Sequence, residues 1–266
     1  MSSEDNNQIV PFPLSRQMIV DSNRLGKKKR NIIGLVEFDI SVPRRLLQAH
    51  KENTGQSISF TAFMIYALGQ AIQAQKEVNA YRYKKKNKII FDEVDVSAVV
   101  ETEFQGAKFP LSHVFREANR RSLLDIHAEL RRIQTEKYES KSMGYWKYLR
   151  GILRLPAFMR DLFYTWVQSS PQRFKKYSGT VSLTAVGMFA PGTSGWGIGL
   201  PNHNLCVTLG GIAEKPWVVE GEIRPRPILN VTVQVNHDVT DGAPAARFVQ
   251  TFKELVERGE GLEGLG

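Results

Sequence analysis

Alternating apolar and polar side chains mark several short stretches of the chain as β-strands. These stretches are rich in Ile, Val and Phe, residues that favour strands. We expect strands over residues 31–41, 94–100, 181–186, 205–209 and 228–236. Residues 81–91 place two short apolar stretches around a lysine-rich centre, which predicts a hairpin whose solvated turn contains Asn87.

Apolar residues spaced three or four positions apart predict four helices. The first covers residues 44–52, with Pro43 in its first turn and Gly55 as its stop. The second begins at a cap, Ser59 or Thr61, and its nearly continuous apolar surface predicts deep burial. The third covers residues 122–137 and the fourth 245–257. Core positions of the last three helices are Phe63, Ala67, Ala71, Ile72, Leu123, Ile126, Leu130, Ile133, Phe248, Val249, Phe252 and Val256.

Helices and strands follow one another without regular β-α-β alternation, and no repeat or Pro-, Gly- or Ser-rich linker divides the chain. This order predicts an α/β protein of the α+β kind, a two-layer sandwich of a mixed β-sheet with packed helices. One domain should cover residues 13–258. We expect flexible ends at residues 1–12 and at the glycine-rich residues 259–266.

The composition is that of a globular protein, and its net charge favours binding of anions. Of the 266 residues, 42% are hydrophobic and 24% charged, so a buried core can form. The net charge of +9 attracts nucleic acids, acidic membranes or phosphate-rich cofactors. The basic runs lack interleaved aromatic residues and indicate turns, so we do not expect nucleic-acid binding.

Cysteine content and the first residues bear on the compartment. The one cysteine, Cys206, excludes an internal disulfide and a multi-cysteine metal site, and it suits a reducing compartment. The first eight residues are polar and carry two acids, unlike a secretory signal. No apolar run reaches the roughly 20 residues that span a membrane. We expect a cytoplasmic protein that uses no metal.

The best candidate for chemistry is His237, directly after the strand over residues 228–236. It continues the parity of Val231, Val233 and Val235, so we expect it on the apolar side, where desolvation would lower its pKa and keep the imidazole neutral. A neutral imidazole is what a general base requires. Asp241 follows at the turn that opens the last helix. The plainer interpretation is a hydrogen-bonded core histidine and a helix cap.

Residues 237–248, HDVTDGAPAARF, resemble the HxxxDG signature and following helix of the catalytic domain of dihydrolipoyl acyltransferases. These are the core subunits of 2-oxoacid dehydrogenase complexes, and they are related to chloramphenicol acetyltransferase. Residues 179–189, GTVSLTAVGMF, are similar to the family's strand that supplies an oxyanion hydroxyl. Residues 77–80 and 214–223 also resemble family segments, in the expected order.

The resemblance implies a chloramphenicol acetyltransferase-like fold and a direct acyl transfer that uses coenzyme A. His237 would take the proton from a thiol, which then attacks a thioester, and Thr184 would donate to the oxyanion. Asp241 would hold the loop by pairing with an N-terminal arginine, for which Arg16 and Arg24 are candidates. The resemblance also implies a trimer with its active sites between subunits. Which basic residues would bind coenzyme A stays open.

Departures from the family leave alternatives open. Asn236 and Asp238 flank the histidine where the family usually has Asp and Arg, and lipoyl and subunit-binding domains are expected to be missing. The acceptor is therefore another protein, a free cofactor or an unrelated small molecule. A noncatalytic trimeric scaffold is the alternative function. Residues 191–199 are glycine-rich but have the wrong spacing and context for a dinucleotide fingerprint.

Residues 138–176 look like an insertion in the family pattern. Within them, residues 142–168 combine aromatic and aliphatic side chains with arginines and lysines, divided by Pro156. Before Pro156, apolar and basic positions take separate helical faces. We favour a helical hairpin packed on the domain. The alternatives are a helix that lies on an anionic membrane and a lid over a greasy acyl chain.

Overall fold

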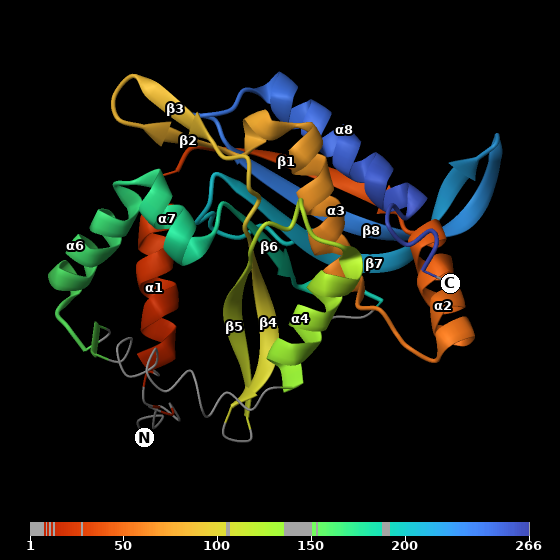
Figure 1. Cartoon of the computed structure of the whole chain (residues 1–266), viewed down its shortest axis with the longest axis horizontal. Helices are drawn as coiled ribbons and strands as arrows, with labels where there is room; N and C mark the ends of the chain where they lie inside the picture. Colours follow the sequence, from red (N-terminus) through yellow and green to blue (C-terminus); the bar gives the residue numbers. More distant parts are fainter. Residues whose placement is uncertain are drawn as a thin grey trace, which may run out of the picture.

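The computed structural model describes residues 8, 10, 12, 14–27, 29–104, 107–135, 151–152, 154–187 and 192–265. Its centre is a six-stranded mixed sheet in the order β1-β8-β7-β6-β4-β5 (Figure 1). Strand β6 runs parallel to β4 and β7, and the other neighbours are antiparallel. The strands are β1 (Asn31–Asp39), β4 (Val96–Phe104), β5 (Ala107–Phe115), β6 (Val181–Ala185), β7 (Leu205–Val219) and β8 (Glu222–Asn236).

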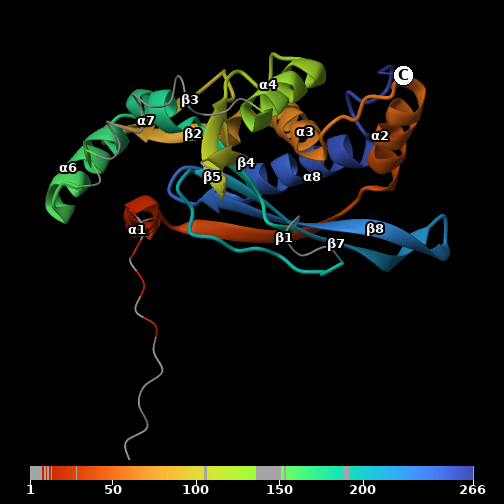
Figure 2. The same ribbon diagram turned by 90° about the horizontal axis from the view of Figure 1, so that it is seen from below.

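Four helices cover one face of this sheet (Figure 2). They are α2 (Ser41–Thr54), α3 (Phe60–Ala74), α4 (Leu123–Thr135) and α8 (Gly242–Arg258). A short 3-10 turn, η1 (Lys76–Val78), leads from α3 to a two-stranded hairpin of β2 (Ala80–Tyr83) and β3 (Asn87–Ile90). Three further helices lie with this hairpin at one end of the molecule, namely α1 (Leu14–Gly26), α6 (Ala157–Gln168) and α7 (Pro171–Ser178). The architecture is the predicted sandwich of a mixed sheet and packed helices.

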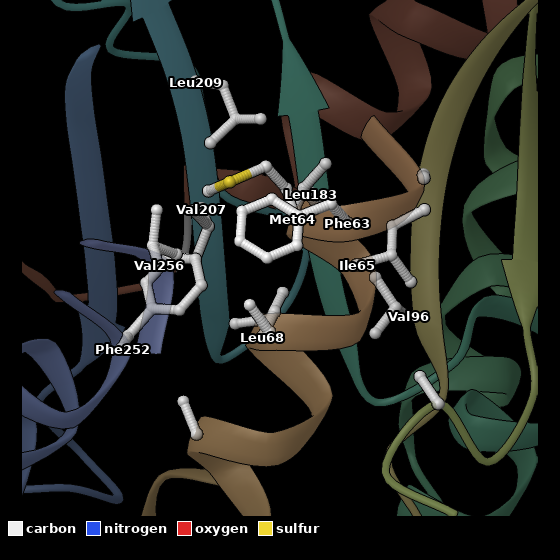
Figure 3. Close-up of a cluster of buried hydrophobic side chains, with 14 of the residues drawn as sticks. Phe63, Met64, Ile65, Leu68, Val96, Leu183, Val207, Leu209, Phe252 and Val256 are labelled. Atoms are coloured by element: carbon white, nitrogen blue, oxygen red, sulfur yellow. The ribbon is translucent and has the colours of Figure 1, made fainter. Parts of the chain in front are cut away.

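The core lies between the sheet and the four helices, with α3 at its centre (Figure 3). The near-continuous apolar surface of α3 leaves nine of its residues buried, as the sequence predicted. Inward-facing strand residues Val96, Leu183 and Val207 meet this helix from the sheet. Phe252 of α8 closes the side of the core and contacts Phe38 edge-on at 5.4 Å between ring centroids.

The predicted strands and helices are present, and several details differ. The helix α1 and the strand β5 were not expected. Gly55 ends α2 in the left-handed conformation as predicted, with φ of 71°. Ser59 occupies the N-cap of α3, but its side chain makes no capping hydrogen bond. Asn87 begins β3 instead of lying in the turn.

Strands β7 and β8 form a hairpin much longer than predicted, because Gly210 and Gly211 do not end β7. They form an irregularity in its pairing with β8 instead. A Cβ at position 211 would lie 1.7 Å from the Thr193 carbonyl oxygen, so glycine lets residues 193–195 cross the strand closely.

The ends and the insertion are only partly described. Of the insertion, residues 138–150 and 153 lie outside the described residues, as does most of the expected flexible N-terminus. Among the described helices, none has the length and apolar character needed to cross a bilayer. The proposed domain boundaries stay a prediction.

Candidate active site

The face of the sheet away from the helices carries rows of polar side chains. Strand register places Ser97, Ser182, Cys206 and Gln234 side by side across β4, β6, β7 and β8. Two residues further along β6, Thr184 pairs with Thr208, which pairs with a threonine of β8. Because alternate residues of a strand point the same way, these rows lie on one face, opposite the apolar core.

A hollow of about 340 Å³ lies over these rows. Its floor includes Ser182, Thr184 and Thr208, and its rim is the loop that runs through Gly197 and His203. Gln234 donates to the Gly199 carbonyl oxygen at 3.0 Å and so ties the loop to β8. Ser182 and Thr184 stand two positions apart in β6, so their hydroxyls lie on the same face of the strand.

His237 lies in the turn between β8 and α8. Its backbone N–H donates to the Arg30 carbonyl oxygen at 2.8 Å, which fixes the turn beside the start of β1. The buried Asn236 side chain accepts from the Asp238 backbone N–H at 3.0 Å, a local turn that asparagine forms readily. The Thr240 hydroxyl donates to the Glu77 carbonyl oxygen. These three hydrogen bonds, made by residues 237, 238 and 240, hold the histidine loop in place.

The expected burial of His237 is wrong for the single chain, since 58% of its side chain is exposed. Strand β8 ends at Asn236, so the turn carries His237 out of the strand's alternation and away from the valines that face the helices. The predicted desolvation therefore has no basis in one isolated chain. Asp241 is the N-cap residue of α8, and its carboxylate lies 3.8 Å from His237 Nδ1.

One chain does not bring His237 and Thr184 together. Thr184 is level with Thr208 on β7 and Thr232 on β8, two strands across and five residues before His237. A strand rise of about 3.3 Å and a strand spacing of about 4.8 Å put them roughly 19 Å apart. Proton transfer needs contact distances, so the two residues of one chain cannot serve the same reaction.

Arg16 and Arg24 were the two candidates for the arginine that pairs with Asp241. In the structure Arg24 pairs with Asp21 at 2.9 Å and with Asp161 at 2.6 Å. Asp241 itself is 86% exposed. A different cation, Arg30, approaches the histidine loop, with its guanidinium 4.0 Å from the Asp238 carboxylate. Asp238, which stands where the family usually has Arg, thus adds a carboxylate to the histidine loop, and Arg30 lies close enough to offset part of its charge.

A buried polar cluster below the histidine loop was missed by sequence reasoning. Lys29 donates to Asn204 Oδ1 at 2.8 Å, and Asn236 donates to the same oxygen at 3.1 Å. Burial lowers the pKa of Lys29 to about 8. Burial raises the pKa of Tyr81 far above its usual range, and its hydroxyl donates to the Thr180 carbonyl oxygen. Lone polar residues inside irregular segments gave no periodic signal that could have identified this cluster.

His203 belongs to the same cluster and lines the hollow. Its Nε2 lies 2.7 Å from the Ser178 carbonyl oxygen, which can only accept, so Nε2 carries the proton. Burial lowers the pKa of His203 to about 4. The His203 ring is therefore neutral near pH 7. Among the described residues, no group of three or more His, Cys, Asp or Glu side chains could hold a metal ion.

Most of the chain matches a known protein family. The sequence model of the 2-oxoacid dehydrogenases acyltransferase (catalytic domain) matches residues 11–143 and 168–263. The interruption, residues 144–167, falls inside the insertion expected from the sequence. Residues 237–242 and Thr184 both lie within the second matched part.

Relatives and solved structures agree with this match. The chain is 24% identical over 255 residues to the dihydrolipoyllysine-residue acetyltransferase component of the Zymomonas mobilis pyruvate dehydrogenase complex, covering 94% of this chain and 50% of the relative. It is 24% identical over 269 residues to a Saccharomyces cerevisiae dihydrolipoyllysine-residue succinyltransferase component, covering 95% and 50%. The chain thus spans about half the length of the curated relatives it matches.

The fold is that of solved acyltransferase structures. A probable dihydrolipoamide acetyltransferase from Listeria monocytogenes superimposes with a TM-score of 0.68 at 20% identity, covering 96% of this chain and 97% of that one. A structure of Azotobacter vinelandii dihydrolipoamide acetyltransferase gives a TM-score of 0.68 at 17% identity, with 97% and 96% covered. That structure accompanies enzymatic work on one serine, one histidine and one asparagine in the catalytic mechanism. These matches confirm the predicted fold class.

Proposed function

This chain belongs to the family of the 2-oxoacid dehydrogenases acyltransferase catalytic domain, and from that premise we propose that it moves an acyl group between coenzyme A and a thiol or hydroxyl acceptor. The observation that carries the proposal is that the family match includes both His237 and Thr184. The relatives' names describe the same kind of transfer to a dihydrolipoyllysine residue. In this proposal the acceptor is a lipoyl thiol or a free small molecule.

In the proposed reaction His237 acts as the general base. Its Nε2 takes the proton of the attacking thiol, and the thiolate adds to the thioester carbonyl carbon. The carbonyl oxygen becomes an oxyanion, to which the Thr184 hydroxyl donates. Collapse of this intermediate breaks the original carbon–sulfur bond, and the leaving thiolate recovers the proton from the imidazolium. No acyl-enzyme forms, and the reverse reaction uses the same groups.

Asp241 serves as a positioning residue in this proposal. Its carboxylate lies near Nδ1 of His237, so it favours the tautomer with the proton on Nδ1 and leaves Nε2 free to accept. The Azotobacter enzyme offers support for the spacing. Its asparagine follows its histidine by as many positions as Asp241 follows His237, and its serine precedes the histidine by nearly the separation of Thr184 from His237.

The separation of His237 and Thr184 within one chain requires a second copy, and we assign a homotrimer. In a closed ring, each copy presents its histidine loop to the open sheet face of the next. Several apolar side chains on and around that face are exposed in the single chain. Monomeric proteins rarely expose large apolar patches, so these side chains suit a contact with another copy. They are Ile33, Leu35, Val99, Val186, Ile198 and Leu200. A related pyruvate dehydrogenase complex forms a cubic core, so a larger assembly is part of the proposal.

The same contact would give His237 the environment that it lacks in one chain. Covering the exposed imidazole excludes water from the site of proton transfer. The surrounding positive charge of the chain suits the phosphates of coenzyme A. A cytoplasmic location, where coenzyme A thioesters and reduced thiols coexist, completes the proposal.

Mixing two inactive variants tests the intersubunit site directly. His237→Ala removes the base and Thr184→Val removes the hydroxyl while keeping the side-chain shape. We expect each homotrimer to lose at least about 100-fold in thiol release from an acyl-CoA panel. Random trimers refolded from equal amounts should regain about one quarter of the wild-type sites, because one site in four joins an intact histidine to an intact threonine.

Controls separate the possible failures. Thr184→Ser keeps a hydroxyl and should remain within about tenfold of wild type. Light scattering verifies that every sample is trimeric. Mixed trimers without recovered activity would refute the site between subunits, and a wild type inert toward every acyl-CoA would leave the scaffold function instead.

A further inference from the structure

The helix α6 presents an apolar face to solvent. Its exposed side chains Phe158, Leu162 and Trp166 follow one another at four-residue intervals, with 65%, 67% and 48% of their surfaces accessible. Met159 and Phe163 flank this stripe and are also exposed. Residues four apart lie on one side of a helix, so the five side chains make one continuous apolar face. We call it the outer face of α6.

The opposite side of α6 is firmly attached to the molecule. Arg160 is buried and donates to both carboxylate oxygens of Asp21 in α1, at 2.8 and 3.2 Å. Val167 is buried beside Tyr81 and Phe174 in a second, smaller hydrophobic cluster. This side of α6 packs on the domain, as the favoured hairpin would, but residues 142–150 of that hairpin lie outside the described residues. The outer face stays exposed because the helix is fixed in that orientation.

The outer face has no part in the family fold. Residues 144–167 fall between the two parts of the chain that match the family. The main core is built from the sheet and the helices α2, α3, α4 and α8. In Figures 1 and 2, α6 extends past the end of this body. An apolar face that covers no core and projects outward is typical of a contact surface.

Several cations lie close to the outer face, in space or in sequence. Arg173 stacks on the Trp166 ring at 4.5 Å, while Arg154 and Lys176 are exposed nearby in sequence. None of these three cations has a salt bridge to a described carboxylate. The one acid of α6 and α7, Asp161, pairs with Arg24. The lysine-rich turn of the β2–β3 hairpin lies at the same end, because α7 contacts β2.

We propose that the outer face of α6 docks on an anionic lipid bilayer. Aromatic and aliphatic side chains on one helical face enter the boundary between headgroups and acyl chains, and cations around them attract acidic lipids. A single projecting helix would bury little apolar area against a flat protein surface, whereas a fluid bilayer can surround its whole apolar face. The docking orients the acyltransferase at the membrane surface, and it does not depend on the proposed catalytic residues.

Vesicle flotation of the full chain tests this surface. The lipids are pure phosphatidylcholine and phosphatidylcholine with about one third phosphatidylglycerol. We expect wild type to float with the acidic vesicles only, less at high salt, and the double variant Phe158→Ser, Leu162→Ser to lose about tenfold or more in partitioning. The matched control, Val218→Ser with Ile223→Ser, removes two equally exposed apolar side chains from the β7–β8 hairpin and should bind like wild type.

Four results would overturn the proposal. The first is wild type that ignores acidic vesicles, and the second is equal flotation of wild type and the α6 variant. The third is a lower oligomer mass in the α6 variant while wild type binds no vesicles, which would mean that α6 contacts another copy. Thiol release from a short acyl-CoA should not change in the variant. A selective loss on long acyl-CoAs without flotation would assign α6 as a lid over the substrate instead.

Discussion

The two faces of the six-stranded sheet use the same strands for different purposes. On the helix-covered face Leu183, Val207 and Val233 are buried in the main core. On the open face, their immediate neighbours Thr184, Thr208 and Thr232 form a row of hydroxyls beside the hollow. The first face is closed within one chain, whereas the second is completed, in our proposal, by another copy. One strand can therefore carry stability and chemistry at adjacent positions.

This difference predicts that substitutions on the two sides affect different measurements. A change in the covered face should alter the free energy of unfolding and leave the chemistry of folded molecules intact. A change at Thr184 or in the histidine loop should alter the rate and leave stability nearly unchanged. Three substitutions test this separation.

The largest expected effect is on the histidine loop. His237→Ala should lower the rate of acyl transfer by about 10²- to 10⁴-fold, because general-base assistance is lost. The side chain is exposed in the single chain, so the free energy of unfolding should change by less than about 0.5 kcal/mol. Steady-state kinetics and urea titrations on the same preparation measure both quantities. A stability loss that matches the activity loss would make His237 structural.

The reverse pattern is expected in the covered face. Phe252 is fully buried and contacts the rings of Phe38 and Phe248. Phe252→Ala should lower the free energy of unfolding by about 3–5 kcal/mol, since it removes a ring and leaves a cavity. The rate per folded active site should stay near wild type. Ile223→Ala, at an exposed position, should change stability by less than about 0.5 kcal/mol.

The covered face was the more predictable of the two from the sequence. Its positions follow regular periods, and the stripe of Leu123, Ile126, Leu130 and Ile133 is buried as expected. Periodicity failed where strands continue through irregularities, as β7 does past Gly210, and where α1 is held by a distant ion pair. Such contacts join residues far apart in sequence, so no local pattern reports them.

The candidate site was identified through resemblance more than through pattern. The resemblance singled out Thr184, and the strand pattern of residues 228–236 placed His237 at the end of β8. Exposure of His237 was missed because strand parity does not extend into a turn. The partner of a site formed between copies is also absent from any one-chain pattern. The buried polar cluster of Lys29 and His203 gave no signal because its members come from irregular segments.

The smallest effect concerns His203, the buried anchor of the loop over the open face. Its folded-state pKa is lowered to about 4, below the ordinary value of 6.5, so the unfolded chain binds the proton more readily. Stability should therefore fall as pH drops from about 6.5 toward 4, by about 2 kcal/mol between pH 7 and pH 5 from this residue alone. His203→Gln keeps a side-chain N–H for the Ser178 carbonyl and cannot titrate. Urea titrations at both pH values should show a smaller acid-induced loss in this variant than in wild type. Equal losses would show that the acid-induced loss of stability does not come from His203.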